Sequence, residues 1–396
     1  MAGMQAQAGG RRTAEGGAAG APVTEADAAA AGAVEDALRA HVAERLAEAH
    51  ATDPAFAEDV AGRVRDLVLR GGKRLRARLL WWGWRACGGP ADGPGAERAR
   101  DLAAALELLQ VCAVVHDDVM DHSPVRRGGP SAHADFALHH TRSGLRGSAD
   151  AYGTAAAILV GDLALAWADD LAAATALTVP EGPRIHREWR ALRAEMAAGQ
   201  YLDLRAAATG ATGLGEAVRI ARLKSALYTV ERPLALGAAL AGAPERTTSV
   251  LRSAGRCAGL AFQLRDDLLG VFGDPRDTGK PAEDLRAGKL TYLRALAVRL
   301  AARSGDTAAL HALTAPAPAP GAQAGAAGAR AADAREALER TGAREVVEAR
   351  IARLVRTGER RLAELPSEPD AVAALAGLLA QAAGVDTAAT TAGGRR

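Results

Sequence analysis

The sequence of 396 residues predicts an all-α fold, and three observations lead to that prediction. Apolar residues recur at spacings of three and four along most of the chain, strand-type alternation is nearly absent, and the linking stretches are rich in Gly, Pro and Asp. The 49% hydrophobic and 24% charged content is typical of a globular protein and excludes collagen-like and wholly disordered chains. We therefore expect a single large helical domain over residues 31–385.

The first helix is expected near residues 31–50, where Leu38, Val42, Leu46 and Ala49 share one face. Residues 1–30 lack this periodicity and predict a disordered tail, as do residues 386–396. The stretch 315–328 reads APAPAPGAQAGAAG and predicts a flexible insert. Further helices are expected near 54–69, 73–87, 96–119, 149–173, 184–208, 214–241, 247–271, 286–303, 333–339, 344–364 and 368–382.

The charges nearly cancel, because 49 basic and 47 acidic side chains leave a net charge of +2. Such a chain has no global field that attracts nucleic acid or an anionic membrane. Its three cysteines are widely spaced and form no CxxC pair, which favours a reducing compartment. No export signal follows Arg11-Arg12, and the best apolar run, 155–167, is interrupted by Asp162. We expect a cytoplasmic protein that is neither membrane-embedded nor bound to nucleic acid.

An acidic run ends one of the most apolar predicted helices. Asp117 and Asp121 are four residues apart and therefore share a helix face, where like charges repel. A divalent cation between their oxygens relieves this repulsion, and carboxylates without cysteine suit Mg²⁺. The alternative, a solvated helix end, is disfavoured by a second pair, Asp266 and Asp267, that follows another apolar segment.

Short basic motifs accompany the two acidic ones. They are GGKRLR at 71–76, Arg126-Arg127-Gly128, and the isolated lysines Lys224, Lys280 and Lys289. Carboxylates that bind Mg²⁺, combined with Arg and Lys, are what a diphosphate group requires. The glycines of GGK lack Walker spacing, so a P-loop nucleotide site is not expected.

In this order and spacing the motifs resemble those of the trans-isoprenyl diphosphate synthases, the polyprenyl synthetase family, and most of all bacterial geranylgeranyl diphosphate synthases. The resemblance spans roughly residues 35–385, and it implies a single large helical bundle of the isoprenoid synthase type with a central active-site cavity. It rests on GGKRLR at 71–76, DDVMD at 117–121, RRG at 126–128, GQYLDL at 199–204, KS at 224–225 and QLRDDLLGVFGDPRDTGK at 263–280. Gly270 departs from the family pattern, since many members carry Asp there, and this implies weaker support around the second acidic motif.

The resemblance implies a set of site residues. Asp117, Asp121 and Asp266 would bind Mg²⁺, with Asp118 and Asp267 in support. The diphosphate of isopentenyl diphosphate would contact Lys73, Arg76, Gln110 and Arg127. The allylic diphosphate (dimethylallyl, geranyl or farnesyl) would contact Arg126, Lys224, Lys280 and Lys289. Lys224, Ser225 and Gln263 are the expected catalytic residues at the reacting centre.

The implied reaction is loss of the allylic diphosphate, attack on the resulting cation by isopentenyl diphosphate, and proton loss to the released pyrophosphate. Cys112 and Ala113 lie one turn before Asp117, and in the family small residues there allow products longer than farnesyl. We therefore expect geranylgeranyl diphosphate as the product. Leu106, Leu109 and Trp167 are candidates for the floor of the tunnel.

Three alternatives remain open from the sequence. One is a synthase of farnesyl or longer polyprenyl diphosphates. A terpene cyclase is disfavoured because Asp266-Asp267 stands where cyclases carry an Asn/Asp-x-x-Ser/Thr-x-x-x-Glu motif, and because GGKRLR is present. A non-catalytic helical subunit is expected to lack one of the two acidic motifs. The resemblance also implies a homodimer.

Overall fold

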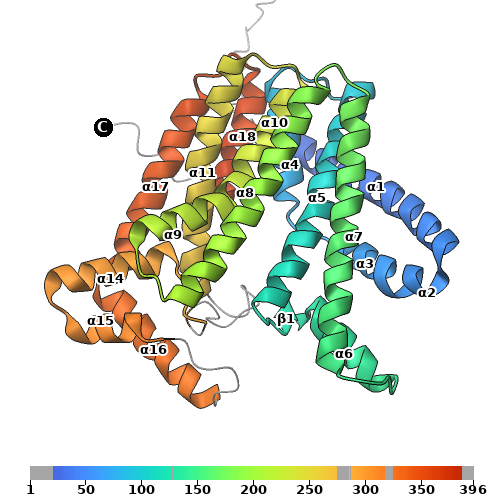
Figure 1. Cartoon of the computed structure of the whole chain (residues 1–396). Coiled ribbons are helices and arrows are strands. Elements are labelled where there is room, and N and C mark those ends of the chain that lie inside the picture. The colour runs from blue at the N-terminus through green and yellow to red at the C-terminus, as the bar shows by residue number, and fades with distance from the viewer. Residues whose placement is uncertain (1–20, 127, 274–284, 286, 317–323, 386–396) are drawn as a thin grey trace, which may run out of the picture.

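The structure is a computed structural model, and it describes residues 21–126, 128–273, 285, 287–316 and 324–385. Its helices run mostly side by side, as the sequence predicts (Figure 1). The long ones are α1 (Ala21–Thr52), α5 (Pro94–Met120), α7 (Ala149–Leu177), α8 (Gly182–Thr209), α11 (Glu245–Phe272) and α17 (Ala343–Leu362). The strands of the described residues, β1 (Val125–Arg126) and β2 (Gly129–Pro130), form one antiparallel pair after α5.

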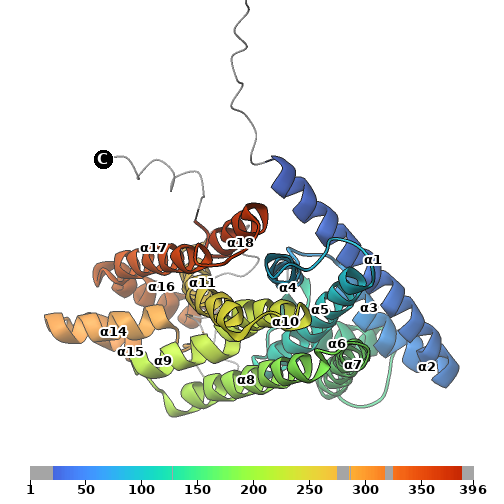
Figure 2. The same ribbon diagram turned by 90° about the horizontal axis from the view of Figure 1, so that it is seen from above.

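Shorter helices fill the spaces between the long ones. Seen from above, α10 (Arg232–Leu240) lies between α4 (Leu75–Ala86) and α8, and α1 runs diagonally along the outer edge of the bundle, beside α5 (Figure 2). A second group of helices packs beside α11 and α17 at the lower left of Figure 1, namely α14 (Tyr292–Ser304), α15 (Thr307–Thr314) and α16 (Ala324–Arg340). The remaining elements are α2 (Pro54–Phe56), η1 (Ala57–Ala61), α3 (Gly62–Leu69), α6 (Ala132–Arg142), α9 (Leu214–Ile220), η2 (Ala221–Glu231) and α18 (Pro369–Ala382).

The main hydrophobic core follows the periodicity of the sequence. Leu38, Leu79 and Leu106 are fully buried in it, together with apolar residues of α1, α4, α5, α7 and α10. A second core joins α11 to α14–α17, with Leu264 and Ile351 at its centre. The apolar spacings that predict the helices are therefore also those that bury their faces.

Two expected boundaries were wrong. Residues 21–30, expected in the disordered tail, belong to α1, where the Asp27 carboxylate accepts hydrogen bonds from Arg78 and from the indole of Trp82. These long-range contacts stabilise a segment whose own composition does not. The insert expected at 315–328 overlaps α16, which begins at Ala324. Helices α6 and α15 were not predicted, and both are short.

Two other differences concern helix type and start. The single helix expected over 214–241 consists of α9, the π-helix η2 and α10 in succession. Helix α14 begins at Tyr292 rather than near 286, because the Thr291 side chain caps it by accepting from the Arg294 N–H.

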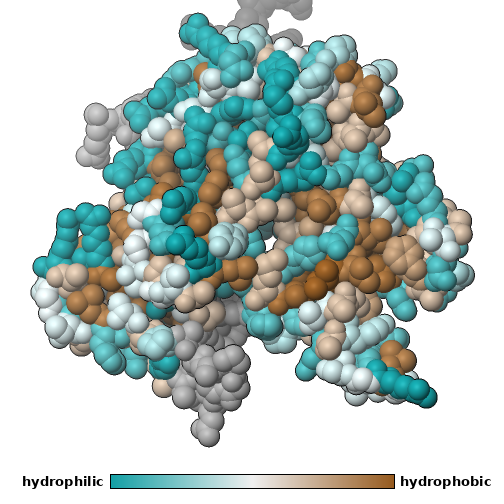
Figure 3. All heavy atoms as spheres, in the orientation of Figure 1, coloured by the Kyte–Doolittle hydropathy of each residue, from teal (hydrophilic) through white to brown (hydrophobic). Residues whose placement is uncertain are grey.

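Helix α7 differs from the sequence-based expectation that no segment could span a membrane. It is long and apolar enough to do so by length and composition, and 44% of its most apolar window is buried inside the bundle. It packs against α5, α6 and α8. Its outward face exposes Tyr152, Ile158 and Leu159, and hydrophobic side chains gather over α7 in Figure 3.

Candidate active site

A cavity of about 1490 Å³ opens between α5, α8, η2 and α11, and in Figure 3 the surface is hollowed in this region. It collects most of the site residues expected from the sequence. Those lining it are Lys73, Arg76, Gln110, Cys112, Ala113, Asp117, Arg126, Lys224, Ser225, Gln263, Asp266, Asp267 and Lys289. Arg127 and Lys280 lie outside the described residues.

The first acidic motif occupies the last turn of α5. Asp117 faces the cavity, and Asp121 follows as the C-cap residue of the helix. Asp118 is buried and accepts hydrogen bonds from Arg126, which also approaches Asp117 to 3.4 Å. Asp118 is thus buried against a guanidinium and does not line the cavity, and its support of the metal ligands stays a prediction.

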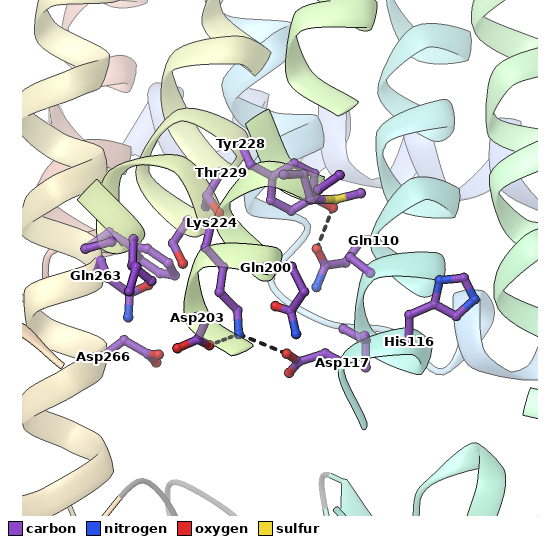
Figure 4. A pocket seen from close by; sticks show the side chains of 18 of the residues that line it. Gln110, His116, Asp117, Gln200, Asp203, Lys224, Tyr228, Thr229, Gln263 and Asp266 are labelled. Carbon is purple, nitrogen blue, oxygen red and sulfur yellow. Dashed lines mark hydrogen bonds and ion pairs between the residues drawn. The ribbon is translucent and has the colours of Figure 1, made fainter. Parts of the chain in front are cut away.

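Lysines from two distant segments lie on these carboxylates. Lys224 Nζ donates to Asp117 Oδ1 at 3.0 Å and to Asp203 Oδ2 at 2.6 Å, and Lys289 Nζ donates to Asp121 Oδ2 at 2.5 Å. Figure 4 shows Lys224 between Asp117 and Asp203, with Asp266 on the opposite wall. The lysines expected to meet an allylic diphosphate are thus already beside the first acidic motif.

The charges around Asp117 and Lys224 favour the ionised form of both. Burial would raise the pKa of the Asp117 carboxyl, but Lys224, Lys289 and Arg126 outweigh it and hold that pKa below its ordinary value. Burial would likewise lower the pKa of Lys224, but the carboxylates of Asp117 and Asp203 raise it. Asp117 is therefore an anionic oxygen donor under all physiological conditions.

The second acidic motif lies on α11. Asp267 is buried and accepts from Gln263 Nε2 at 2.8 Å and from the Tyr292 N–H at 3.1 Å, so it ties α11 to the start of α14. Asp266 lines the cavity, as does Gly270 one turn later. The side chains of Asp266 and Asp117 therefore face the same cavity.

The carboxylates fit a hard divalent cation by their chemistry. Asp117 and Asp266 present oxygen donors from opposite walls, and oxygen is the donor that Mg²⁺ prefers. Among the described residues no three acidic, His or Cys side chains converge on one point, and the lysines neutralise Asp117 and Asp121 instead. In this arrangement the motif residues compensate one another's charge.

A second group of polar residues occupies the α4 side of the cavity. Arg76 donates to Thr229 Oγ1 at 2.8 Å, and its guanidinium lies over the ring of Tyr228, 4.4 Å from the centroid. The Tyr228 hydroxyl donates to Gln110 Oε1 at 2.7 Å. Lys73 completes this wall. Lys73, Arg76 and Gln110 are thus brought together, as the resemblance implies for one diphosphate.

The π-helix η2 carries Lys224 and Ser225 into the cavity. Two glycines let neighbouring helices approach it closely, since a Cβ at Gly199 of α8 would lie 2.2 Å from Lys224 N and one at Gly259 of α11 would lie 2.4 Å from Ala226 O. Local π-helical geometry is often found at functional sites, where it reorients side chains. Here it directs Lys224 toward Asp117.

The apolar part of the cavity begins directly below Asp117. Cys112 and Ala113 line it, whereas the expected floor residues Leu106, Leu109 and Trp167 are buried in the main core and do not. Leu165 of α7 and the small residues Ala191 and Ala194 of α8 also line the cavity. Two arginines of α8, Arg187 and Arg190, line it as well. Burial raises the pKa of the Cys112 thiol to about 12, consistent with a wall residue and not a nucleophile.

Three residues of the site were missed by sequence reasoning. Asp203 lies within the motif GQYLDL and binds Lys224, while Tyr228 and Thr229 follow KS and hold Arg76. The motif around Asp203 was the available signal. The pairing itself joins residues far apart in the sequence, so spacing alone does not give it.

Comparison with known proteins identifies a family and several relatives for this chain. A family model described as polyprenyl synthetase matches residues 58–320. The geranylfarnesyl diphosphate synthase of Aeropyrum pernix is 34% identical over 249 residues, covering 62% of this chain and 72% of that protein. The geranylgeranyl diphosphate synthase of Sulfolobus acidocaldarius is 30% identical over 57% of this chain and 63% of that protein, just under two thirds of its length.

The fold of this chain is also similar to that of solved structures. The geranylgeranyl pyrophosphate synthase from Corynebacterium glutamicum, complexed with isoprenyl diphosphate and magnesium, superposes with a TM-score of 0.80 and 34% identity. That similarity covers 88% of this chain and 98% of the other. The likeness therefore extends over the whole helical bundle.

Proposed function

Since this chain belongs to the polyprenyl synthetase family, we propose that it condenses isopentenyl diphosphate with allylic diphosphates to give geranylgeranyl diphosphate and pyrophosphate. The observation that carries the proposal is the composition of one cavity. It joins the carboxylates of Asp117 and Asp266, the cationic wall of Lys73 and Arg76, and an apolar extension past Ala113. Two diphosphates and a hydrocarbon chain require these three environments together.

The residues have distinct tasks in this reaction. Asp117, Asp121 and Asp266 would hold Mg²⁺, which when bound supplies positive charge that stabilises the leaving diphosphate. Lys224 and Lys289 can move from the carboxylates to phosphate oxygens, and Arg126 adds donors beside them. Arg127 and Lys280 are proposed for the same diphosphate sites on the resemblance alone.

The bond-forming step takes place between the two diphosphate sites. The allylic C–O bond breaks, its electrons leave with pyrophosphate, and the double bond of isopentenyl diphosphate supplies the electrons of the new C–C bond. Loss of a proton to pyrophosphate then restores a double bond. The Gln263 and Ser225 side chains line the cavity here, where amide and hydroxyl dipoles can stabilise the cation.

The product length follows from the apolar wall. Cys112 and Ala113 leave space below Asp117, which favours a product longer than farnesyl diphosphate. The Sulfolobus relative is named for geranylgeranyl diphosphate, and the Aeropyrum relative for the next longer product. We therefore propose geranylgeranyl diphosphate, with geranylfarnesyl diphosphate as the alternative.

We also propose that the protein is a cytoplasmic homodimer that is not membrane-embedded. The exposed apolar residues of α7, Tyr152, Ile158 and Leu159, would be covered by a second copy of the chain. Sedimentation of the purified protein without detergent tests whether it is a dimer that needs no membrane. A monomer or a detergent-dependent particle would contradict it.

The experiment that tests the proposed activity compares two aspartates of α5. Asp117→Asn should lower the rate of isopentenyl diphosphate incorporation by roughly a hundredfold or more, because it removes an anionic donor at the reacting centre. Asp101→Asn changes an aspartate on the same helix that does not line the cavity, so it should keep wild-type activity. Equal rates for the two variants would contradict the assignment.

A further inference from the structure

The loop that precedes α4 has an unusual conformation. Lys73 of this loop and Arg76 of the first turn of α4 both line the cavity, and Arg74 lies between them in the chain as the N-cap residue of α4. Arg74 has φ 45° and ψ 37°, a left-handed conformation that non-glycine residues rarely adopt. Gly71 and Gly72 before it also have positive φ. Contacts elsewhere must therefore hold the loop in this shape.

The Arg74 side chain supplies those contacts by pointing away from the cavity. Its Nε donates to Glu35 Oε1 of α1 at 2.5 Å, and its Nη1 donates to Glu107 Oε2 of α5 at 3.1 Å. Its Nη2 donates to the Val68 carbonyl of α3 at 2.6 Å. One buried guanidinium thus joins three helices, and its side chain is only 7% exposed.

Such a group is costly to bury, and a buried ion pair seldom adds net stability over apolar residues of similar size. It does fix one conformation, because the planar guanidinium satisfies all three acceptors only in a narrow range of positions. Glu35 also precedes the segment 58–320 that matches the family model. The contact therefore brings α1 into the support of this loop.

The two cavity residues beside Arg74 depend on it unequally. Arg76 has supports of its own in Thr229 and Tyr228. Among the described residues, Lys73 is hydrogen-bonded only at its backbone carbonyl, which accepts from Arg78 at 3.5 Å. The direction of the Lys73 side chain is thus set chiefly by the loop.

We propose that Arg74, held by Glu35 and Glu107, is a positioning residue for the isopentenyl diphosphate site. It keeps Lys73 and Arg76 directed into the cavity together without touching the substrate. This inference rests on the proposed function. It predicts a selective effect, because Arg74 is next to Lys73 and two residues before Arg76, whereas its hydrogen bond to α5 is made at Glu107, ten residues before Asp117.

The test is a pair of KM values for each of several variants. Arg74→Lys keeps the charge but cannot reach three acceptors, so KM for isopentenyl diphosphate should rise at least about tenfold, the value of one lost charged hydrogen bond. KM for farnesyl diphosphate should stay within about twofold of the wild type, since its contacts are unchanged. If Arg74→Lys does not fold, Glu35→Gln should show the same selectivity, since Glu35 is only half-buried and tolerates the change better.

The control is Arg232→Lys. Arg232 is a half-buried arginine bound to Glu188 and Glu195, but it is on α10 and does not line the cavity. Its variant should lose thermal stability and leave the ratio of the two KM values unchanged.

The outcomes separate the inference from the proposed function. Equal increases of both KM values in Arg74→Lys, or no change in either, would overturn the positioning role. If the wild type shows no activity, KM cannot be measured, and calorimetric titration with isopentenyl diphosphate measures the dissociation constant instead. If that protein still binds isopentenyl diphosphate, and Arg74→Lys binds it about tenfold more weakly, the proposed function fails but the role of Arg74 stands.

Discussion

The ammonium group of Lys224 lies between two carboxylates, 3.0 Å from Oδ1 of Asp117 and 2.6 Å from Oδ2 of Asp203. It occupies space beside an oxygen that the proposed reaction needs for Mg²⁺. Lys289 has the same relationship to Asp121. The lysines and the cation therefore compete for the same carboxylates. A bound diphosphate would end this competition, because its oxygens can accept hydrogen bonds from the lysines and can also bind the cation.

Removal of Lys224 should strengthen binding of Mg²⁺ in the absence of diphosphate. In Lys224→Met the Asp117 carboxylate loses its closest cation, so Mg²⁺ affinity should rise about tenfold, while turnover should fall by a hundredfold or more. Calorimetric titration with MgCl₂ measures the first effect. Lys73→Met is the control: it removes another cavity lysine for which the described residues give no carboxylate contact, and it should leave Mg²⁺ affinity unchanged. Weaker Mg²⁺ binding by Lys224→Met would refute the competition.

The same ion pair should contribute to stability in a defined pH window. The folded-state pKa of Asp117 lies below its ordinary 3.8 and that of Lys224 above its ordinary 10.5. The contribution is complete between those ordinary values, and it is lost as the pH falls through the folded pKa of Asp117. Urea unfolding should show a wild-type advantage over Lys224→Met that is constant from about pH 5 to 9 and shrinks below about pH 4. An advantage that grows in acid would contradict the pairing.

A larger side chain at Ala113 should shorten the product. Ala113 lines the cavity just below Asp117, so Ala113→Phe should block the apolar extension and shift the end product from geranylgeranyl to farnesyl diphosphate. Chromatography of the dephosphorylated alcohols measures this. Ala113→Ser, of similar volume, should keep the wild-type product. An unchanged product from the Phe variant would mean that the chain runs elsewhere.

The close approach of α8 to η2 should make Gly199 sensitive to substitution. A Cβ there would lie 2.2 Å from the backbone nitrogen of Lys224, so Gly199→Ala should cost about 2 kcal/mol or more of unfolding free energy and lower activity by displacing Lys224. Gly215→Ala in α9 meets nothing within 4 Å and should stabilise by up to about 1 kcal/mol. Denaturant unfolding of both variants measures the two changes in unfolding free energy. Equal changes would mean that η2 can shift away from a side chain at position 199.

The sequence predicts the bundle well because apolar spacing is a local property. Leu38 and Leu79, for example, are buried as the helical periodicity requires. Residues 21–30 were wrongly placed in a tail, since their helix depends on the contact of Asp27 with Arg78, 51 residues away. Short helices such as α6 have too few apolar positions to show a clear period.

The motifs predicted which side chains meet in the cavity, but not how they pair there. The Asp203 and Lys224 contact spans 21 residues, and Arg74 reaches Glu35 across 39. Both depend on tertiary packing. The expected tunnel floor was wrong for a similar reason: Leu106 and Leu109 face the core, and only the orientation of α5 in the bundle decides that.

The most direct test of the account is the identity of the product. Purified protein with Mg²⁺ and labelled isopentenyl diphosphate would be incubated separately with dimethylallyl, geranyl and farnesyl diphosphate, and the dephosphorylated alcohols chromatographed. We expect geranylgeraniol as the end product from each primer. Farnesol or longer alcohols would keep the reaction and reject the proposed length. No elongation with any primer, or a cyclic hydrocarbon formed from a prenyl diphosphate alone, would contradict the proposed function.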